Sequence, residues 1–499
     1  MINIVVYLLP LGEMPVFSEE TRSQSGIEAQ RTLSEEPTSK LTEIITKNGL
    51  RIIVDERPGS TTVHCSIIVS VGSRYEPEGL NGISHLIEHI LFREDWWPPY
   101  DNEAAIQCDA ERDEIFNQIR SSGGILNGST TFEYTRYYVT APASEFKNVL
   151  GGLSRLVLEP CFNRRGINLE KKVILHEIAF TKNNPFAIAY YSLINRVIPD
   201  NPLGRPIAGT TLSIKTISFD RIREFYQTYY IPNNMTVVIV GGIDTEIALS
   251  EVEKIFSNKE KSPLPDKSFS IPHFKLPKSP FYKGGKRGIK LKTLTKQGYF
   301  ALIVRTDGEK DIEKHAMRLL YSILGPGKNS RLYHKLKEEG LSDFFISAED
   351  FGLQELASLS DIGIWGFVIG THPDNLKRLE EIVLSEIEKM KSTPTSEDEL
   401  TIAKSETIGK LRINFESNEF RASIYIHWSV SGSSGRTDRN VCPTIDTFLQ
   451  EIDKISTEQI TCAVKEHFKD DRLLVVTVMP AKGLGIIWAA IKFLLFKRI

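Results

Sequence analysis

Two histidines and a glutamate that lie close together in the chain are the residues best suited to chemistry. The segment Gly82–Phe92 reads GISHLIEHILF and contains His85, Glu88 and His89. Residues three or four positions apart lie on the same face of a helix. The two imidazoles could therefore bind one metal ion, with the carboxylate of Glu88 beside it. This H-x-x-E-H order reverses the common H-E-x-x-H zinc motif and indicates metal-assisted hydrolysis.

The alternative is a solvated helix face on which these residues meet by chance. The whole chain has only ten histidines, so a chance match to this motif has a probability of about one percent. The apolar residues Leu86, Ile87, Ile90 and Leu91 take the opposite side of the same helix. The metal-binding interpretation is therefore preferred.

A catalytic zinc ion needs a third protein ligand and an open fourth position. Glu177 is the best candidate, because on a helical wheel it falls between Val173 and Ile174, with Ile178 and Phe180 on the flanks. A carboxylate inside an apolar stripe is costly unless a cation pairs with it. The sequence therefore predicts Glu177 as a metal ligand. An arginine or lysine from elsewhere in the chain is the alternative partner.

Two further polar residues lie near Glu177. Glu170 comes seven residues earlier on the same predicted helix face, and it could hydrogen-bond to one of the ligands from behind. His176 points about 100° away from Glu177 on the wheel, which makes it the weaker ligand candidate.

The elements that must position these residues alternate between strands and helices. Their order lacks the regular βαβ rhythm of a doubly wound sheet and predicts an α+β fold, with mainly antiparallel sheets packed with helices. Strands are expected at 50–57, 62–72, 124–139 and 235–241, and helices at 82–92, 102–121, 143–158, 168–182 and 216–229.

The second half of the chain repeats this order and predicts a duplicated domain. Its expected strands are 298–305, 361–370 and 473–479, and its expected helices are 310–324, 330–339 and 374–391. The predicted organisation is a flexible arm at 1–40, a metal-binding domain at 41–260, a Pro/Gly-rich linker at 261–288, a second homologous domain at 289–480 and an apolar tail at 481–499.

Charge and cysteine content exclude several classes of protein. The net charge of −3 and the isoelectric point near 6.4 provide no general attraction to nucleic acid or acidic membranes. Five cysteines without a CxxC pair predict neither a disulfide framework nor a thiolate zinc site, and therefore a reducing, cytoplasmic compartment.

The C-terminal tail is unusually apolar. Leu484–Phe496 reads LGIIWAAIKFLLF, and its thirteen residues are too few to span a bilayer. A helix docked on the protein or on a partner subunit is the preferred interpretation. Membrane contact as an interfacial anchor is the alternative.

Longer segments carry a family resemblance. The chain resembles the pitrilysin/insulinase family of zinc metallopeptidases, and within it the short-chain branch that includes the mitochondrial processing peptidase and its bacterial relatives. The resemblance implies Zn²⁺ bound by His85, His89 and Glu177, with Glu88 as general base, and two homologous halves. The matching segments are VGSRYEPEGLNGISHLIEHILF (71–92), SGGILNGSTTFEYTRYYV (122–139), the region 170–178 and NPLGRPIAGT (201–210).

The same resemblance implies a site for a peptide substrate. The strand at 124–139 is expected to offer its edge to an extended peptide, which would add as a further strand. Asn127 and Gly128 are then expected on that edge. The alternative is that these two residues form a turn where the strand starts.

Two segments depart from the family pattern. The stretch 93–114 is longer than expected and contains Trp96 and Trp97; it either shapes access to the site or packs on a neighbour. Active members carry an Arg and a Tyr in their second half that grip the substrate. In the matching stretch 337–344, Lys337 replaces the Arg, and either Asp343 or Phe344 replaces the Tyr. Lysine lacks the planar fork of arginine.

The missing pair predicts an inactive second domain and a homologous partner subunit that supplies the Arg and Tyr, in a heterodimer or a homodimer. The leading hypothesis is thus the zinc-bearing subunit of a two-subunit endopeptidase acting on unstructured peptides or leader and presequence segments. A non-catalytic scaffold or binding subunit of the same fold is the alternative hypothesis.

Overall fold

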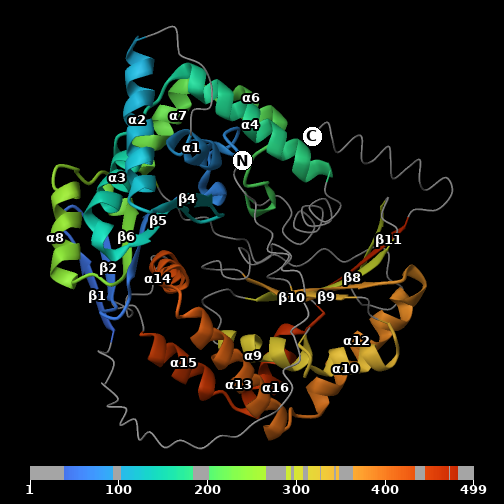
Figure 1. Ribbon diagram of the computed structural model, residues 1–499. Helices are drawn as coiled ribbons and strands as arrows, with labels where there is room; N and C mark the ends of the chain where they lie inside the picture. The colour runs from blue at the N-terminus through green and yellow to red at the C-terminus, as the bar shows by residue number, and fades with distance from the viewer. Residues whose placement is uncertain are drawn as a thin grey trace, which may run out of the picture. The chain divides into compact units, whose positions relative to one another are not determined.

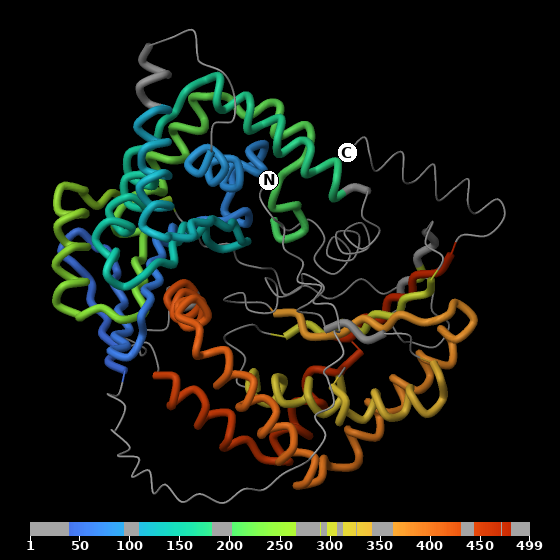
Figure 2. Tube along the Cα trace, viewed as in Figure 1, coloured from blue at the N-terminus to red at the C-terminus, as the bar shows by residue number. Residues whose placement is uncertain are grey.

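The computed structural model shows a mixed α+β chain with two sheets, each accompanied by its own helices (Figure 1). The helices that accompany the first sheet are coloured blue to green and those that accompany the second are yellow to red (Figure 2). The exception is α14 (Asn418–Gly432), which belongs to the later part of the chain but packs on the first sheet. The structure describes residues 39–93, 103–183, 202–265, 288–293, 297–306, 313–325, 327–341, 344–347, 363–432, 444–470 and 472–480.

The first sheet has six strands in the order β1-β2-β6-β3-β5-β4. Neighbours run antiparallel except β2 and β6, which are parallel. The strands are β1 (Lys40–Ile45), β2 (Arg51–Glu56), β3 (Thr62–Val69), β4 (Ile125–Thr130), β5 (Thr135–Pro142) and β6 (Met235–Gly241). The run of apolar, β-branched residues at 235–241 forms a fully buried strand, as its composition predicts.

The segment 124–139, predicted as one strand, is a hairpin instead. In the pairing of β4 with β5, Asn127 lies opposite Tyr138 and Gly128 opposite Tyr137. The turn closes because both the backbone N–H and the hydroxyl of Thr131 donate to the Tyr134 carbonyl oxygen. The turn residues TFEY contain no glycine or proline, so the usual turn signal was absent. The single-strand prediction was therefore wrong.

Helices cover one face of the first sheet and bury its apolar side chains. Ile52, Ile67 and Val139 from the strands share a core with Leu86 and Ile87 of α1. The motif helix is therefore held by its apolar side. The helices are α1 (Ile83–Leu91), α2 (Glu103–Ser121), α3 (Phe146–Leu158), α4 (Arg164–Asn183), α6 (Thr211–Thr216), α7 (Phe219–Tyr229) and α8 (Thr245–Phe256).

The second sheet has five strands in the order β7-β11-β8-β10-β9, and only β7 and β11 are parallel neighbours. The strands are β7 (Gly288–Thr293), β8 (Gly298–Thr306), β9 (Phe344–Ser347), β10 (Gly363–Thr371) and β11 (Leu473–Pro480). The accompanying helices are α9 (Lys314–Leu324), α10 (Arg331–Glu338), α12 (Leu376–Ser392), α13 (Glu397–Asn414), α15 (Ile445–Asp453) and α16 (Thr457–His467). Both sheets are mainly antiparallel, which confirms the predicted fold class.

Helix α14 (Asn418–Gly432) follows α13 in the chain but packs on the first sheet. Its apolar residues share a core cluster with Ile53 and its neighbours on the sheet face opposite α1. Asp55 is buried there and accepts hydrogen bonds from Arg421 and from the Tyr425 hydroxyl, each at 2.9 Å. A buried carboxylate with two such donors fixes the register of this contact.

Several predicted segments fall outside the described residues. They include nearly all of the arm 1–40, most of the linker 261–288, the tail 481–499 and residues 94–102 of the longer stretch 93–114. The proposed domain boundaries therefore stay a prediction.

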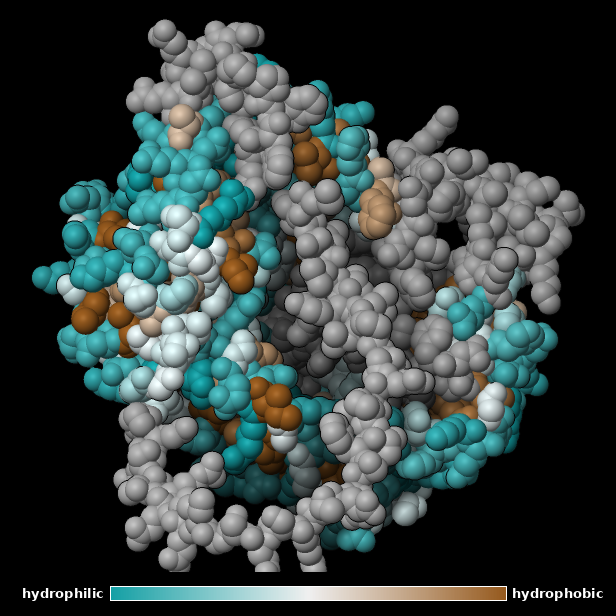
Figure 3. Space-filling model, viewed as in Figure 1, coloured by the Kyte–Doolittle hydropathy of each residue, from teal (hydrophilic) through white to brown (hydrophobic). Residues whose placement is uncertain are grey.

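No helix in the described part of the chain is both long and apolar enough to cross a membrane. Figure 3 shows hydrophilic residues over most of the described surface on this side, with apolar residues in small separate groups. Scattered apolar side chains of this kind are normal on protein surfaces.

The cysteines depart in one respect from expectation. Cys65 and Cys462 are free thiols, whereas Cys161 is disulfide-bonded. The sequence predicted no disulfide framework, and it did not predict the bond at Cys161. The inference of a reducing compartment loses the support that it drew from the cysteines.

Candidate metal centre

The helix that carries the motif, α1, begins at a closely packed glycine. Gly82 has a φ of 90°, which favours glycine, and a Cβ there would come within 2.8 Å of the Ala208 carbonyl oxygen. The buried Glu76 accepts hydrogen bonds from the backbone N–H groups of Gly82 at 2.7 Å and Ser84 at 2.9 Å. Glu76 thus supplies the cap that Gly82, without a side chain, cannot provide.

This cap leads to a prediction about stability. Replacing Glu76 with alanine leaves buried N–H donors unpaired at the start of α1, and we expect the free energy of unfolding to fall by about 2 kcal/mol. Chemical denaturation measures the change. Glu78→Ala is the matched control, because Glu78 is exposed two residues away. Equal stability of the two variants would contradict the capping role.

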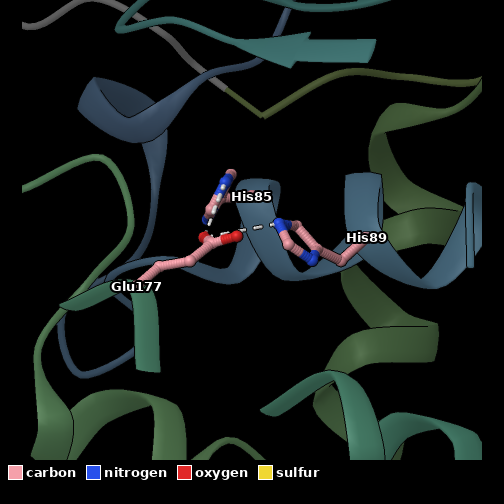
Figure 4. Close-up of side chains that lie close together, drawn as sticks. All are labelled: His85, His89 and Glu177. Carbon is pink, nitrogen blue, oxygen red and sulfur yellow. Dashed lines mark ion pairs between the residues drawn. The ribbon is translucent and has the colours of Figure 1, made fainter. Parts of the chain in front are cut away.

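Three side chains from two helices converge near one point. His85 and His89 come from α1, and Glu177 comes from α4, which packs against α1. The Glu177 Oε2 atom lies 3.9 Å from His85 Nε2 and 3.6 Å from His89 Nε2. Figure 4 shows the Glu177 carboxylate directed toward both imidazoles. The potential ligand atoms of these residues all lie within 4.8 Å of one another.

These distances and donors suit zinc. Ligand atoms about 2.0–2.1 Å from a tetrahedral zinc ion are about 3.3 Å apart. The observed 3.6 and 3.9 Å exceed this separation by about 0.3 and 0.6 Å, and all ligand atoms lie within 4.8 Å of one another. Two imidazole nitrogens and one carboxylate oxygen form a common catalytic zinc set that leaves one position open. An arginine or lysine was the alternative partner of Glu177, but among the described residues none pairs with it.

Glu170 lies behind one of the two histidines. Its Oε2 atom is 3.2 Å from His89 Nδ1. If Nδ1 donates this hydrogen bond, the lone pair of Nε2 is directed toward Glu177 and is free to bind a metal. Burial disfavours the charged form of His89, yet the bond to Glu170 and the nearby carboxylates outweigh it and raise the pKa of His89.

The other two ligand candidates also have shifted pKa values. Burial lowers the pKa of His85 well below its usual value, and His89 adds to this effect. Burial raises the pKa of Glu177; His89 opposes this rise and Glu170 adds to it. A divalent cation at the cluster would favour the neutral imidazole and the ionised carboxylate that metal binding requires.

Glu88 lies beside the cluster and is buried, with 7% of its surface exposed. Its Oε2 atom accepts a hydrogen bond from the Thr130 hydroxyl of β4 at 2.5 Å. Burial raises the pKa of Glu88, while His89 and the bond from Thr130 act in the opposite direction. The Glu88 carboxylate therefore lies next to the three potential ligands, with one of its oxygens hydrogen-bonded to Thr130.

The apolar stripe predicted around Glu177 is only partly present. Ile174 and Ile178 are buried, but Val173 is 41% exposed and Phe180 71% exposed. Glu177 therefore lies at the border of the buried face, within reach of solvent, rather than in its middle. This position suits a ligand of a metal ion that must remain accessible to water.

Asn127 and Gly128 lie on β4, the outermost strand of the first sheet. They belong to a regular strand, so the alternative of a turn at this point is wrong. The Gly128 N–H donates to the side-chain oxygen of its neighbour Asn127 at 2.8 Å. Among the described residues, only β5 pairs with β4, which leaves its outer edge available to another strand.

The second half has no comparable cluster among its described residues. Its helices α9 and α13 pack together as α1 and α4 do. Where they meet, the hydroxyls of Ser322 and Thr407 lie 3.0 Å apart. Lys337 is exposed on α10, with its ammonium 5.6 Å from the Tyr333 ring centre. The side chain of Phe344 lies outside the described residues.

Reasoning from the sequence missed two residues near the site. Glu76 lies in the segment 71–92 that carries the family resemblance. Its role as the cap of α1 depends on the chain turning back on itself before the helix, which no local sequence pattern predicts. Thr130 follows Gly128 by two residues on a strand, so both residues face the same side of the sheet. The alternation of β4 could have indicated Thr130, had the hairpin been recognised.

Comparison with known families gives two consecutive matches. Residues 51–211 match the family described as insulinase (peptidase family M16), and residues 216–407 match the peptidase M16 inactive domain. A protein of Rickettsia bellii named as an uncharacterized zinc protease is 28% identical over 379 residues, covering 75% of this chain and 84% of the relative. One of Bacillus subtilis with the same description is 24% identical over 440 residues, covering 86% and 96%.

Solved structures agree with this assignment at the level of the fold. A protease from Helicobacter pylori superimposes with a TM-score of 0.72 at 22% identity, covering 89% of this chain and all of that one (100%). A peptidase M16 inactive domain from Pseudomonas fluorescens gives a TM-score of 0.71 at 17% identity, covering 89% and 99%. Since the two family matches together span most of both sheets and their helices, the chain belongs to the pitrilysin/insulinase family, peptidase family M16.

Proposed function

We propose that this chain is a zinc-dependent endopeptidase that cleaves unstructured peptides, such as leader or presequence segments. The observation that carries the proposal is the convergence of His85, His89 and Glu177 with the buried Glu88 beside them. Three protein ligands with an adjacent carboxylate form a catalytic rather than a structural arrangement, because structural zinc sites are closed by four protein ligands. The names of the relatives as zinc proteases support this reading.

In this proposal His85, His89 and Glu177 hold the ion, and Glu170 fixes the orientation of His89. Bound zinc supplies Lewis acidity toward the scissile carbonyl and lowers the pKa of water toward 7. An ion held by the neutral imidazoles of His85 and His89 and the carboxylate of Glu177 would keep a net positive charge, which would favour negative charge on the substrate oxygen.

Glu88 acts as the general base and then as the acid. Its Oε2 atom accepts a hydrogen bond from the Thr130 hydroxyl. Oε1 is therefore the oxygen that takes a proton from the attacking water. The same group delivers that proton to the leaving amine as the peptide bond breaks. Asn127 and Gly128 on the β4 edge hold the substrate as an added strand, which reads its backbone more than its side chains.

The proposal includes a second, homologous subunit. The region 216–407 matches a domain described as inactive, and Lys337 and Phe344 stand where active members carry Arg and Tyr. A partner with that pair would complete the site. The same match favours the second candidate function, a non-catalytic scaffold, but the intact cluster around His85 and His89 speaks for an enzyme.

Metal analysis tests the proposal directly. We expect about one zinc per chain after dialysis, and loss of that zinc in His85→Ala and His89→Ala. Glu177→Gln should weaken binding less, because the amide keeps one oxygen but loses the charge. His334→Ala is the control, since His334 is exposed outside the site. Unchanged zinc content in both histidine variants would exclude this metal centre.

A further inference from the structure

We propose that Thr130 is a positioning residue for Glu88: its hydroxyl holds the carboxylate in the one orientation from which Oε1 can accept a proton. The inference rests on the proposed function, in which Glu88 is the base. It adds a residue outside the motif and outside the metal ligands, and it assigns β4 a second task besides offering an edge to a peptide.

The contact between the two residues is short and enclosed. The Thr130 Oγ1 atom donates to Glu88 Oε2 at 2.5 Å, and each residue is only 7% exposed. A charge-assisted O–H···O bond of this length is among the stronger hydrogen bonds in proteins. Because water has little access to it, the bond competes with few alternatives and holds the glutamate rotamer.

Gly128 limits the carboxylate from a second direction. A Cβ at Gly128 would lie 3.1 Å from Glu88 Cγ and 3.2 Å from Oε1, so the glycine leaves just enough space for this rotamer. Thr130 and Gly128 lie on the same face of β4. One oxygen of Glu88 is bound to Thr130, and the other lies beside Gly128 of the same strand.

Thr130 is itself fixed by the residues around it. Thr135 lies opposite it in the hairpin, is fully buried, and donates from Oγ1 to the Val71 carbonyl at 2.9 Å. The hairpin turn is bound to the segment that leads into α1, because the Ser73 N–H donates to the Thr131 carbonyl at 3.1 Å. The strand carrying Thr130 and the helix carrying Glu88 therefore share one rigid frame.

The buried ion pair between Arg74 and Glu133, at 2.5 Å, strengthens this frame. It joins the same segment before α1 to the same turn after β4. A peptide that adds to the outer edge of β4 is thus held by the strand that also holds the base. Because β4 holds both Glu88 and the bound peptide, the distance and orientation between the carboxylate and the scissile bond stay fixed. Fast proton transfer requires such a fixed geometry.

The test compares two replacements at one position. Thr130→Val keeps the shape and removes the hydroxyl, and we expect it to retain zinc and lower kcat about 10- to 100-fold with little change in KM. Thr130→Ser restores the hydroxyl and should recover most of that loss. Ser129→Ala is the control, because its side chain points to the opposite face of β4. Initial rates on a quenched fluorescent peptide, with the peptide in excess over the enzyme and its concentration varied, give kcat and KM.

A double-mutant cycle shows whether Thr130 acts through Glu88. In a Glu88→Gln background, Thr130→Val should cause no further loss, since the group that it positions is already gone. A kcat of Thr130→Val within about twofold of wild type, a serine variant no better than valine, or an additive loss in the double variant each overturns the proposal.

A crystal structure of Thr130→Val separates this inference from the proposed function. It should show the Glu88 carboxylate turned away or in more than one rotamer, a result that does not depend on peptide cleavage. The same single rotamer as in wild type overturns the positioning role even if the enzyme is active. Absence of cleavage by wild type, both alone and with a homologous partner subunit, together with a displaced Glu88 in the variant instead rejects the proposed function and keeps the positioning role.

Discussion

Replacing Glu88 with glutamine is expected to leave the fold and the zinc content unchanged and to lower peptide hydrolysis at least about a hundredfold. The amide occupies the same volume and can still accept the hydrogen bond from Thr130. It cannot accept a proton from water, which is the function assigned to the carboxylate. Initial rates on an unstructured peptide, measured beside metal analysis of the same preparation, give the result.

Glu78→Gln is the matched control for this experiment. Glu78 is exposed ten residues before Glu88 and outside the metal cluster, so it should cleave at the wild-type rate. Cleavage by Glu88→Gln as fast as by wild type would show that Glu88 is not the base. Loss of zinc together with activity would instead mean that Glu88 supports the metal ligands.

The convergence of the candidate ligands was predictable because its signals are local. Histidines at i and i+4 on a helix with an apolar opposite side specify both the element and the face, and α1 spans Ile83–Leu91 within the predicted 82–92. Glu177 was predictable from its conflict with the apolar residues around it, and the structure brings it to the two imidazoles. The conflict was milder than assumed, because Val173 and Phe180 are exposed.

Features that depend on contacts between distant segments were not predictable in the same way. Nothing in the polar run that contains Thr130 shows which hydroxyl meets Glu88, because that depends on a hairpin with no glycine or proline in its turn. Asp55 reads as an isolated acid at the end of an apolar strand. Its partners Arg421 and Tyr425 lie more than 360 positions away, and no periodicity links them.

The predicted elements of the second half were recovered where apolar periodicity was strong. β10 and α12 were expected at 361–370 and 374–391 and are observed at Gly363–Thr371 and Leu376–Ser392. Helices α13, α14, α15 and α16 and strands β7 and β9 were not predicted. In α13 apolar residues are spread around the helix rather than gathered on one face, and α14 packs on the first sheet while belonging to the second half of the chain. In both cases burial by other elements decides the structure.

The second large effect is expected from a partner subunit. The purified chain alone should cleave peptides slowly, and a homologous subunit with an intact Arg/Tyr pair should raise the rate about 100- to 1,000-fold. The reason is chemical. An arginine presents a planar pair of donors to a peptide backbone, whereas the ammonium of Lys337 is a point charge, and Phe344 has no hydroxyl to donate to an oxyanion.

The structure sharpens the competing account. Lys337 is exposed on α10 next to the Tyr333 ring, as expected of a residue on a solvated helix face with no part in catalysis. On that account the region 216–407 serves only to support the first domain, and the rate should not respond to changes at 337 and 344. The two accounts therefore differ in one measurable quantity, the turnover of the isolated chain.

Three preparations measured on one unstructured peptide separate them. They are the wild-type chain, the double variant Lys337→Arg with Phe344→Tyr, and the wild-type chain mixed with a candidate homologous subunit. If the missing pair limits catalysis, the second and third should exceed the first, and Lys335→Arg, an exposed change on the same helix, should not. Full activity of the isolated wild-type chain, improved by neither change, would remove the main support for a two-subunit enzyme while leaving the zinc site and Glu88 untouched. The loss of Arg and Tyr would then mean that binding on the β4 edge and the charge at the metal suffice to stabilise the oxyanion.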